Sequence, residues 1–262
     1  MLTTGRAIAS SARRYEGLTQ LGVVLLAVAA YELARLAMTP DWTVATANAG
    51  RIAELERDLA LAWEPALQDA FLALPSLVEA LNVFYFVGHF LFTGIFFLWL
   101  YHRSRAGFRV FRDGFLVATA ISVLVHWLFP TAPPRLAEQE IVDTLRLLSG
   151  IDIGSPTSTG LSNPVAAVPS LHAGYAIGVG IGVFRHAGVP LVRGLALAYP
   201  ALVVLTIIVT GNHFVLDAVA GVAVMGAGFW LAVKVRAWLG AHRKPLQNPA
   251  ILATATRGGA VR

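Results

Sequence analysis

Charged residues are scarce in this chain. They make up 13% of its 262 residues, whereas soluble domains carry about a quarter, so an ordinary water-soluble globular domain is excluded. Cysteine is absent, which excludes disulfide bonds and thiolate metal sites. The formal net charge of +5 would suit a nucleic-acid-binding protein, but the basic residues here flank apolar segments. We therefore expect a membrane protein with no nucleic-acid partner.

The chain contains several long hydrophobic runs. Hydrophobic residues make up 56% of the sequence, and several runs approach the roughly 20 residues that a helix needs to cross a bilayer. The sequence predicts an all-α integral membrane six-helix bundle, a single domain over residues 1–262 with flexible tails at about 1–17 and 238–262. The six expected spans are 18–38, 78–100, 109–129, 170–186, 189–210 and 213–235.

Two long segments are too polar for the bilayer core. Residues 40–76 contain the amphipathic run "RIAELERDLALAWEPALQDAF", which we expect to lie as a helix at the membrane interface. Within it, "NAGRIAELERDL" is expected to be an ordinary solvated amphipathic helix and not a binding element. Residues 130–169 are rich in proline, serine and threonine, a composition that predicts a loop.

The distribution of Lys and Arg predicts which side of the membrane each loop occupies. With six alternating spans, both tails, the loop 101–112 and the turn 185–193 share one side, and they hold most of the basic residues. Such loops stay in the cytoplasm. We therefore expect a protein of the plasma (inner) membrane with both termini in the cytoplasm, and with 40–76 and 130–169 on the extracytoplasmic side.

Three short polar patches are predicted to meet at that extracytoplasmic end. "HWLFPTAPPRL" closes the third span and supplies Arg135. "VPSLHAG" opens the fourth span with Ser170 and His172, and "GNHFVLDAVAG" opens the sixth with His213 and Asp217. Polar side chains that point into a bundle at a membrane boundary are costly and are functional by default. We expect these residues to form an active site on the outer face.

The types and spacing of these residues indicate phosphate chemistry. His213 and Asp217 are four apart, so on a helix they share a face, and an Asp bonded to one imidazole nitrogen makes the other a better base or nucleophile. Pro169 and Ser170 predict a helix start capped by Ser170, with no acid in its first turn to neutralise an anion site. Arg135 suits phosphate oxygens. Two histidines around an anion supply a nucleophile and an acid.

The order of the three motifs resembles that of a known family. "PTAPPR", then "PSLH", then "HFVLD" about 40 residues later resemble the type 2 phosphatidic acid phosphatase superfamily of membrane lipid phosphatases. Leu171, where the phosphatases proper usually have glycine, resembles the inositol phosphorylceramide synthase-like branch. The resemblance covers most of the chain.

The resemblance implies a role for each residue of the motifs. His213 would attack phosphorus with Asp217 supporting it, and His172 would protonate the leaving group. Ser170 and Arg135 would hold the phosphate oxygens.

Two departures from the family pattern bear on the substrate. Ile207 stands where the phosphatases proper usually have an arginine, and the first motif lacks its usual upstream lysine. A pocket with fewer fixed cations favours a phosphodiester over a doubly charged monoester, and so a transferase. Arg51, Arg57 or Arg146 could replace the missing cation.

Four more polar residues are candidates for lining the substrate: His89, Tyr85, Asn163 and Asn212. His126, in contrast, is expected to be a packing residue.

Two pairs of polar residues each have a simple structural interpretation. Glu32 and Arg35 are expected to form a local ion pair in the first span. His213 and Asp217 could be two metal ligands, but histidine metal sites usually have three or more protein ligands. We therefore expect neither a metal nor another cofactor.

The sequence thus predicts a metal-independent enzyme, a lipid phosphatase or lipid phosphotransferase. It would act through a phosphohistidine on a phospholipid or polyprenyl phosphate, with the bilayer and that lipid as its partners. A non-enzymatic transporter or binding protein for an anionic lipid or phosphate is the alternative. Transporters carry polar residues at the bilayer midplane and often paired repeats. Here the polar cluster is expected at one end, spans three to six are almost free of midplane charge, and the sequence shows no internal repeat. A catalytically inactive lipid-binding protein is a third reading, against which intact His172, His213 and Asp217 argue.

Overall fold

The computed structural model describes residues 2–38, 41–138, 140–152 and 165–242, with side chains from Tyr15 onward. These residues form helices and loops, with no strand beyond one isolated parallel bridge between Thr131 and Ala166. The elements are α1 Leu2–Ala37, α2 Trp42–Asp58, α3 Glu64–Leu72, α4 Pro75–Val83, the π-helix η1 Phe84–Gly88, α5 His89–Arg103, α6 Arg105–Leu128, α7 Pro134–Ala137, α8 Thr144–Ser149, α9 Leu171–His186, α10 Pro190–Val209 and α11 Val215–His242.

Helices occupy all six positions that the sequence predicts for spans. Four of them are long and apolar enough to cross a bilayer: residues 15–37, 75–103, 190–209 and 215–242. The other two are α6, whose first turns carry several charges, and α9, which has 16 residues. Both are packed inside the bundle, α6 against α11 and α9 against α10 and α11. The all-helical prediction is confirmed, and four of the six predicted spans have the length and composition that crossing requires.

The second span differs from its prediction in its start and in its geometry. It begins at Pro75, and α4 continues into α5 through the π-helical turn Phe84–Gly88. A Cβ on Gly88 would lie 2.7 Å from the Phe84 ring, so a larger residue at this turn would require the ring to shift. Such π-turns occur often at functional sites, and this one leads directly into His89.

Helices α9 and α11 approach each other through glycine. A Cβ on Gly174 would lie 2.8 Å from the Gly221 carbonyl oxygen, and one on Gly221 would lie 2.0 Å from the Ser170 carbonyl oxygen. Small residues let helix backbones approach in this way. The contact brings the start of α9 against the first turns of α11.

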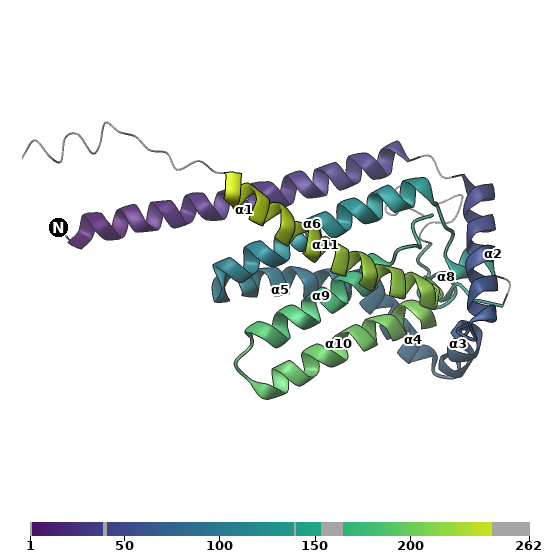
Figure 1. The fold of residues 1–262 in the computed structure, drawn as a ribbon. Helices are drawn as coiled ribbons and strands as arrows, with labels where there is room; N and C mark the ends of the chain where they lie inside the picture. The colour runs from purple at the N-terminus through teal and green to yellow at the C-terminus, as the bar shows by residue number, and fades with distance from the viewer. Residues whose placement is uncertain (1, 39–40, 139, 153–164, 243–262) are drawn as a thin grey trace, which may run out of the picture.

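Segment 40–76 caps one end of the bundle. Figure 1 shows α2, α3 and α8 gathered at this end, while the α5–α6 and α9–α10 turns lie at the other. Instead of one helix, the segment forms α2 and α3, interrupted near Ala60, whose φ is +56°. The expectation of an ordinary solvated helix was wrong for one face of α2, because Asn48, Ile52 and Glu56 are buried. Asn48 donates to the Pro130 carbonyl at 2.8 Å.

The helices also extend into the predicted tails. Helix α1 begins at Leu2, and α11 continues to His242, so most of the N-terminal tail and the first part of the C-terminal tail are helical. In the first span, the expected local ion pair is confirmed, with Arg35 Nη2 2.7 Å from Glu32 Oε2.

Candidate active site

The third motif forms the link between α10 and α11. Helix α10 ends at Val209, and Gly211, with a φ of +69°, turns the chain. The N–H groups of Asn212 and His213 both donate to the Ile207 carbonyl, at 3.0 and 3.1 Å. The side chain of Ile207 is fully buried in an apolar cluster. The position where the family usually has an arginine is therefore packed among apolar residues and supplies no charge.

His213 is fixed through one ring nitrogen. Its Nδ1 lies 3.2 Å from Asp217 Oδ2 and 3.0 Å from the Ala167 carbonyl oxygen. Both neighbours are acceptors, so Nδ1 carries the proton and Nε2 of the neutral ring keeps its lone pair. The predicted contact with Asp217 is present, but not along one helical face, because α11 begins only at Val215.

The second motif starts helix α9 as the sequence predicts. Ser170 is the N-cap, and its hydroxyl accepts from the Ala173 N–H at 3.3 Å. Its hydroxyl hydrogen remains available as a donor. The Ser170 N–H donates to the Asp217 carbonyl at 2.9 Å, which ties the second motif to the third. No acidic residue stands in the first turn of α9.

His172 lies in an aromatic cluster next to His213. The centroid of its ring is 4.5 Å from that of Tyr85, 4.9 Å from His89, 5.4 Å from Phe90 and 5.7 Å from His213. The Nε2 atoms of His172 and His89 are buried and have no hydrogen-bond partner within the described part of the chain. Unpaired buried polar atoms call for an explanation, and a bound substrate group is one. Two of the predicted lining residues, Tyr85 and His89, thus lie at the site.

Arg135 adjoins the link that carries His213. Its Nε donates to Asn212 Oδ1 at 2.9 Å, and its backbone N–H donates to the Gly211 carbonyl at 2.9 Å. Its Nη1 donates to Asp143 Oδ2 at 2.7 Å. Asp143 also caps α8 through the Arg146 N–H. No motif pointed to this carboxylate, which lies eight residues after Arg135 and offsets part of its charge.

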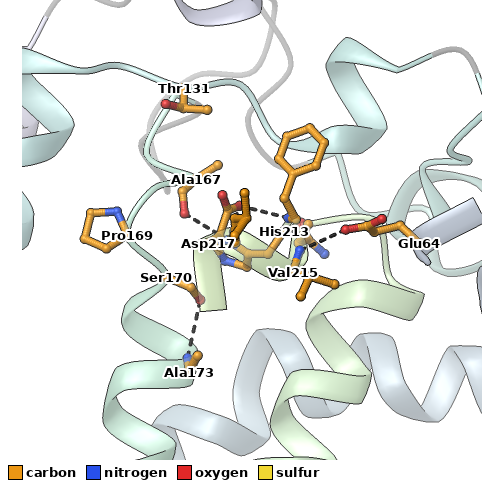
Figure 2. A network of polar contacts seen from close by, with 12 residues as sticks. Glu64, Thr131, Ala167, Pro169, Ser170, Ala173, His213, Val215 and Asp217 are labelled. Carbon is orange, nitrogen blue, oxygen red and sulfur yellow. Dashed lines mark hydrogen bonds and ion pairs between the residues drawn. The ribbon is translucent and has the colours of Figure 1, made fainter. Parts of the chain in front are cut away.

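Glu56 and Glu64 are the other residues that sequence reasoning missed. Three consecutive N–H groups at the start of α11 donate to three carboxyl groups: Phe214 to Asp217 at 2.9 Å, Val215 to Glu64 at 2.8 Å and Leu216 to Glu56 at 2.6 Å. Figure 2 shows the Glu64 carboxyl reaching the Val215 N–H beside the His213–Asp217 pair.

Both glutamates are buried, with exposed fractions of 1% for Glu56 and 3% for Glu64. Burial raises the pKa of Glu56 to about 9, and the hydrogen bond that its protonated carboxyl donates to Glu64 adds to this rise.

The remaining predicted residues lie elsewhere or have other partners. His126 is buried, with Nε2 3.2 Å from the Pro169 carbonyl oxygen, as expected of a packing residue. Asn163 lies outside the described residues. The three proposed replacement cations, Arg51, Arg57 and Arg146, are exposed. Within the described ranges, no group of three His, Asp or Glu side chains is arranged as a metal site.

The fold and the site together define a class of protein: a helical membrane protein with two histidines and a buried aspartate at one end of its bundle. A family model of the PAP2 superfamily matches residues 50–231. The chain therefore belongs to the PAP2 superfamily, whose members are generally phosphatases, and membership indicates a lipid-phosphatase-like function. No curated protein and no solved structure matches the chain. The resemblance is confirmed for the superfamily, while the synthase-like branch stays a prediction.

Proposed function

We propose that this protein is a metal-independent phosphatase or phosphotransferase that acts on a lipid phosphate through a phosphohistidine intermediate. The observation that carries the proposal is the state of His213. Its Nδ1 is held by two acceptors, Asp217 and the Ala167 carbonyl, so the opposite nitrogen presents its lone pair. The His172 ring lies 5.7 Å away, centroid to centroid, so both imidazole rings can reach the same phosphoryl group.

The reaction takes two steps. The phosphate docks on Arg135, Ser170 and the first N–H groups of α9. His213 Nε2 attacks phosphorus, the bond from phosphorus to the leaving oxygen breaks, and His172, protonated, gives its proton to that oxygen. His172, now neutral, takes a proton from water or an alcohol, whose oxygen attacks the phosphohistidine and frees His213. Asp217 stabilises the charge that forms on the His213 ring.

Two observations favour transfer on a phosphodiester over hydrolysis of a monoester. Ile207 is buried in the core and supplies no cation. Arg135 shares its charge with Asp143, across 2.7 Å. The site therefore holds less positive charge than two ionised phosphate oxygens call for. Leu171 of the "PSLH" motif agrees with the transferase-like branch, and a lipid alcohol, polyol or sugar would be the acceptor.

The site is proposed to face the extracytoplasmic leaflet of the plasma (inner) membrane. In support, the starts of α9 and α11 lie at the end of the bundle opposite the basic α5–α6 and α9–α10 turns, and basic turns remain in the cytoplasm. The chain has no cysteine, so single cysteines at exposed Arg146 and Arg103 can be labelled from either side. Labelling of Arg146→Cys by an impermeant reagent from outside supports this orientation, and labelling of Arg103→Cys from outside contradicts it.

The activity is tested on the purified full-length protein in detergent. Phosphatidic acid, polyprenyl pyrophosphate and phosphoinositol lipids are each assayed for phosphate release and for headgroup transfer to an added alcohol, with and without EDTA. We expect turnover that EDTA does not affect. Loss of activity with EDTA contradicts the metal-free mechanism. Anionic-lipid binding without any turnover instead favours the transporter or binding-protein alternative.

A further inference from the structure

The start of α11 is bound in an unusual way. The first N–H groups of a helix lack partners within the helix, and one cap side chain or water usually satisfies them. Here Phe214, Val215 and Leu216 each donate to a different carboxyl group. One carboxyl belongs to α11 itself, whereas Glu64 and Glu56 come from α3 and α2, more than 150 residues earlier in the chain.

These bonds control the geometry of the proposed nucleophile. His213 and Asp217 flank the three bonded N–H groups, one before them and one after them. The turn between the two residues sets the distance and angle of the bond from Nδ1 to Oδ2, which is 3.2 Å long. Fixing Val215 and Leu216 from outside therefore fixes the direction in which His213 Nε2 points.

The carboxyl groups of Glu56, Glu64 and Asp217 form a buried cluster, and its negative charge must be limited. Two buried carboxyl groups in contact, beside a third, cannot all be ionised without strong repulsion. Asp217 faces Glu56 from α11 and Glu64 faces it from α3, and both act to keep the Glu56 carboxyl protonated. Burial raises the pKa of Glu138, the residue after α7, while Arg57 lowers it and Glu64 raises it. A proton on the Glu56 carboxyl, donated to Glu64, limits the negative charge of the cluster.

We propose that Glu56 and Glu64 are positioning residues for the His213–Asp217 pair. They share one proton, and their two oxygens hold the first turn of α11 in the orientation that aims His213 at phosphorus. The inference rests on the proposed function, since it assigns these residues to the same site. It also gives α2 and α3 a role in catalysis, because each supplies one of the two positioning residues.

The shared proton can be tested without any substrate. Infrared spectra of the full-length protein in lipid nanodiscs report the carbonyl band of a protonated carboxyl group. We expect this band at neutral pH, and we expect it to disappear as the pH rises through about 9. Glu56→Gln should remove the titrating band, and Glu54→Gln, an exposed residue of the same helix, should leave it. A titration that is unchanged in Glu56→Gln overturns the shared proton.

The positioning role is tested by kinetics on the lipid that the panel shows to be turned over. Glutamine keeps an acceptor for the Leu216 N–H, so Glu56→Gln should keep its neutral-pH activity. Glu56→Ala should lower kcat roughly 10- to 100-fold with little change in KM, because a misaimed group costs about that much. Unchanged kcat in Glu56→Ala, or a neutral-pH kcat of Glu56→Gln as low as that of Glu56→Ala, overturns the role.

The two tests also separate the inference from the proposed function. If no lipid of the panel is turned over, the proposed function fails, and the infrared titration still shows whether the carboxyl pair exists. If turnover depends on His213 while the Glu56 variants behave as the wild type in both tests, the inference alone fails.

Discussion

Two helices begin side by side at the candidate site, and acidic groups bind the start of only one of them. The first turn of α9 has no acidic residue, and its cap is the neutral Ser170. The first N–H groups of α11 are bound by the carboxyl groups of Glu56, Glu64 and Asp217. Both starts present N–H groups and the positive end of a helix dipole. One is thus left able to bind an anion, and the other is already satisfied by acids that belong to the protein.

This difference divides the proposed reaction between the two helices. The start of α9 suits the phosphate, which is an anion that arrives and leaves. The start of α11 suits the nucleophile, which must stay fixed while phosphorus is attacked. A single backbone bond, from the Ser170 N–H to the Asp217 carbonyl at 2.9 Å, sets the spacing of the two starts.

The largest effect is expected when the start of α9 is made acidic, because this removes the difference between the two helix starts. Ser170→Asp keeps a good N-cap and places a negative charge where the phosphate docks. We expect kcat/KM to fall about a hundredfold or more, the usual loss when one stabilising group is removed from a developing oxyanion. Ser170→Asn is the matched control, because it is also a good N-cap and is uncharged. Equal kinetics of the two variants would contradict an anion site at α9.

The spacing of the two starts depends on Gly221. In Gly221→Ala the new Cβ would lie 2.0 Å from the Ser170 carbonyl oxygen, so α9 and α11 must move apart. We expect a loss of about 1–3 kcal/mol in the free energy of unfolding, as overpacking usually causes, and a lower kcat. Gly226→Ala in the same helix meets nothing within 4 Å and should unfold as the wild type does. A normal unfolding midpoint for Gly221→Ala in detergent would show that the close contact is absent.

The acid-bound start of α11 should make stability depend on pH. The pKa of Glu56 is raised from 4.5 to about 9 by burial and by Glu64. The folded protein thus binds this proton more tightly than the unfolded chain does. The contribution is full below about pH 4.5, falls as the pH rises, and is gone above about pH 9. We expect the unfolding temperature to fall more steeply with pH in the wild type than in Glu56→Gln. Parallel curves would contradict the raised pKa.

The smallest expected effect concerns the cation beside α11. In Asp143→Asn the carboxylate that pairs with Arg135 at 2.7 Å becomes neutral, while the cap of α8 is kept. More of the guanidinium charge then acts on the phosphate, and we expect KM to fall roughly two- to fivefold, a change of about 0.4–1 kcal/mol in binding. Asp69→Asn, at an exposed position of α3, serves as the control. A higher KM in Asp143→Asn would show that Asp143 orients Arg135 instead.

Short sequence patterns correctly predicted several local features of the structure. Proline followed by serine marked the start of α9 with Ser170 as its cap. The separation of four residues predicted the contact of His213 with Asp217, although the backbone there is a turn and not yet a helix. The burial of His126 could also be predicted, since a lone histidine in an apolar run usually finds a backbone partner.

The features that sequence reasoning missed are long-range contacts of side chains with the backbone. Glu56 lies on the buried face of an amphipathic helix, four residues after Ile52, but nothing in its position indicates that it binds the N–H of Leu216, 160 positions away. The Ala167 carbonyl that accepts from His213 carries no side-chain signal at all. Hydrophobic periodicity shows which face of a helix is buried, but not which distant N–H group lies opposite a given carboxyl. Only the packing of α2 and α3 over α11 sets these pairs.

The central claim is that His213 carries the phosphoryl group. The most direct measurement is to mix the protein with radiolabelled lipid phosphate, quench the reaction, and locate the label. We predict an acid-labile, base-stable phosphate on His213 that is absent in His213→Ala and retained in His242→Ala, a change of an exposed histidine at the far end of α11. Label on another residue, or turnover that survives in His213→Ala, would contradict the account.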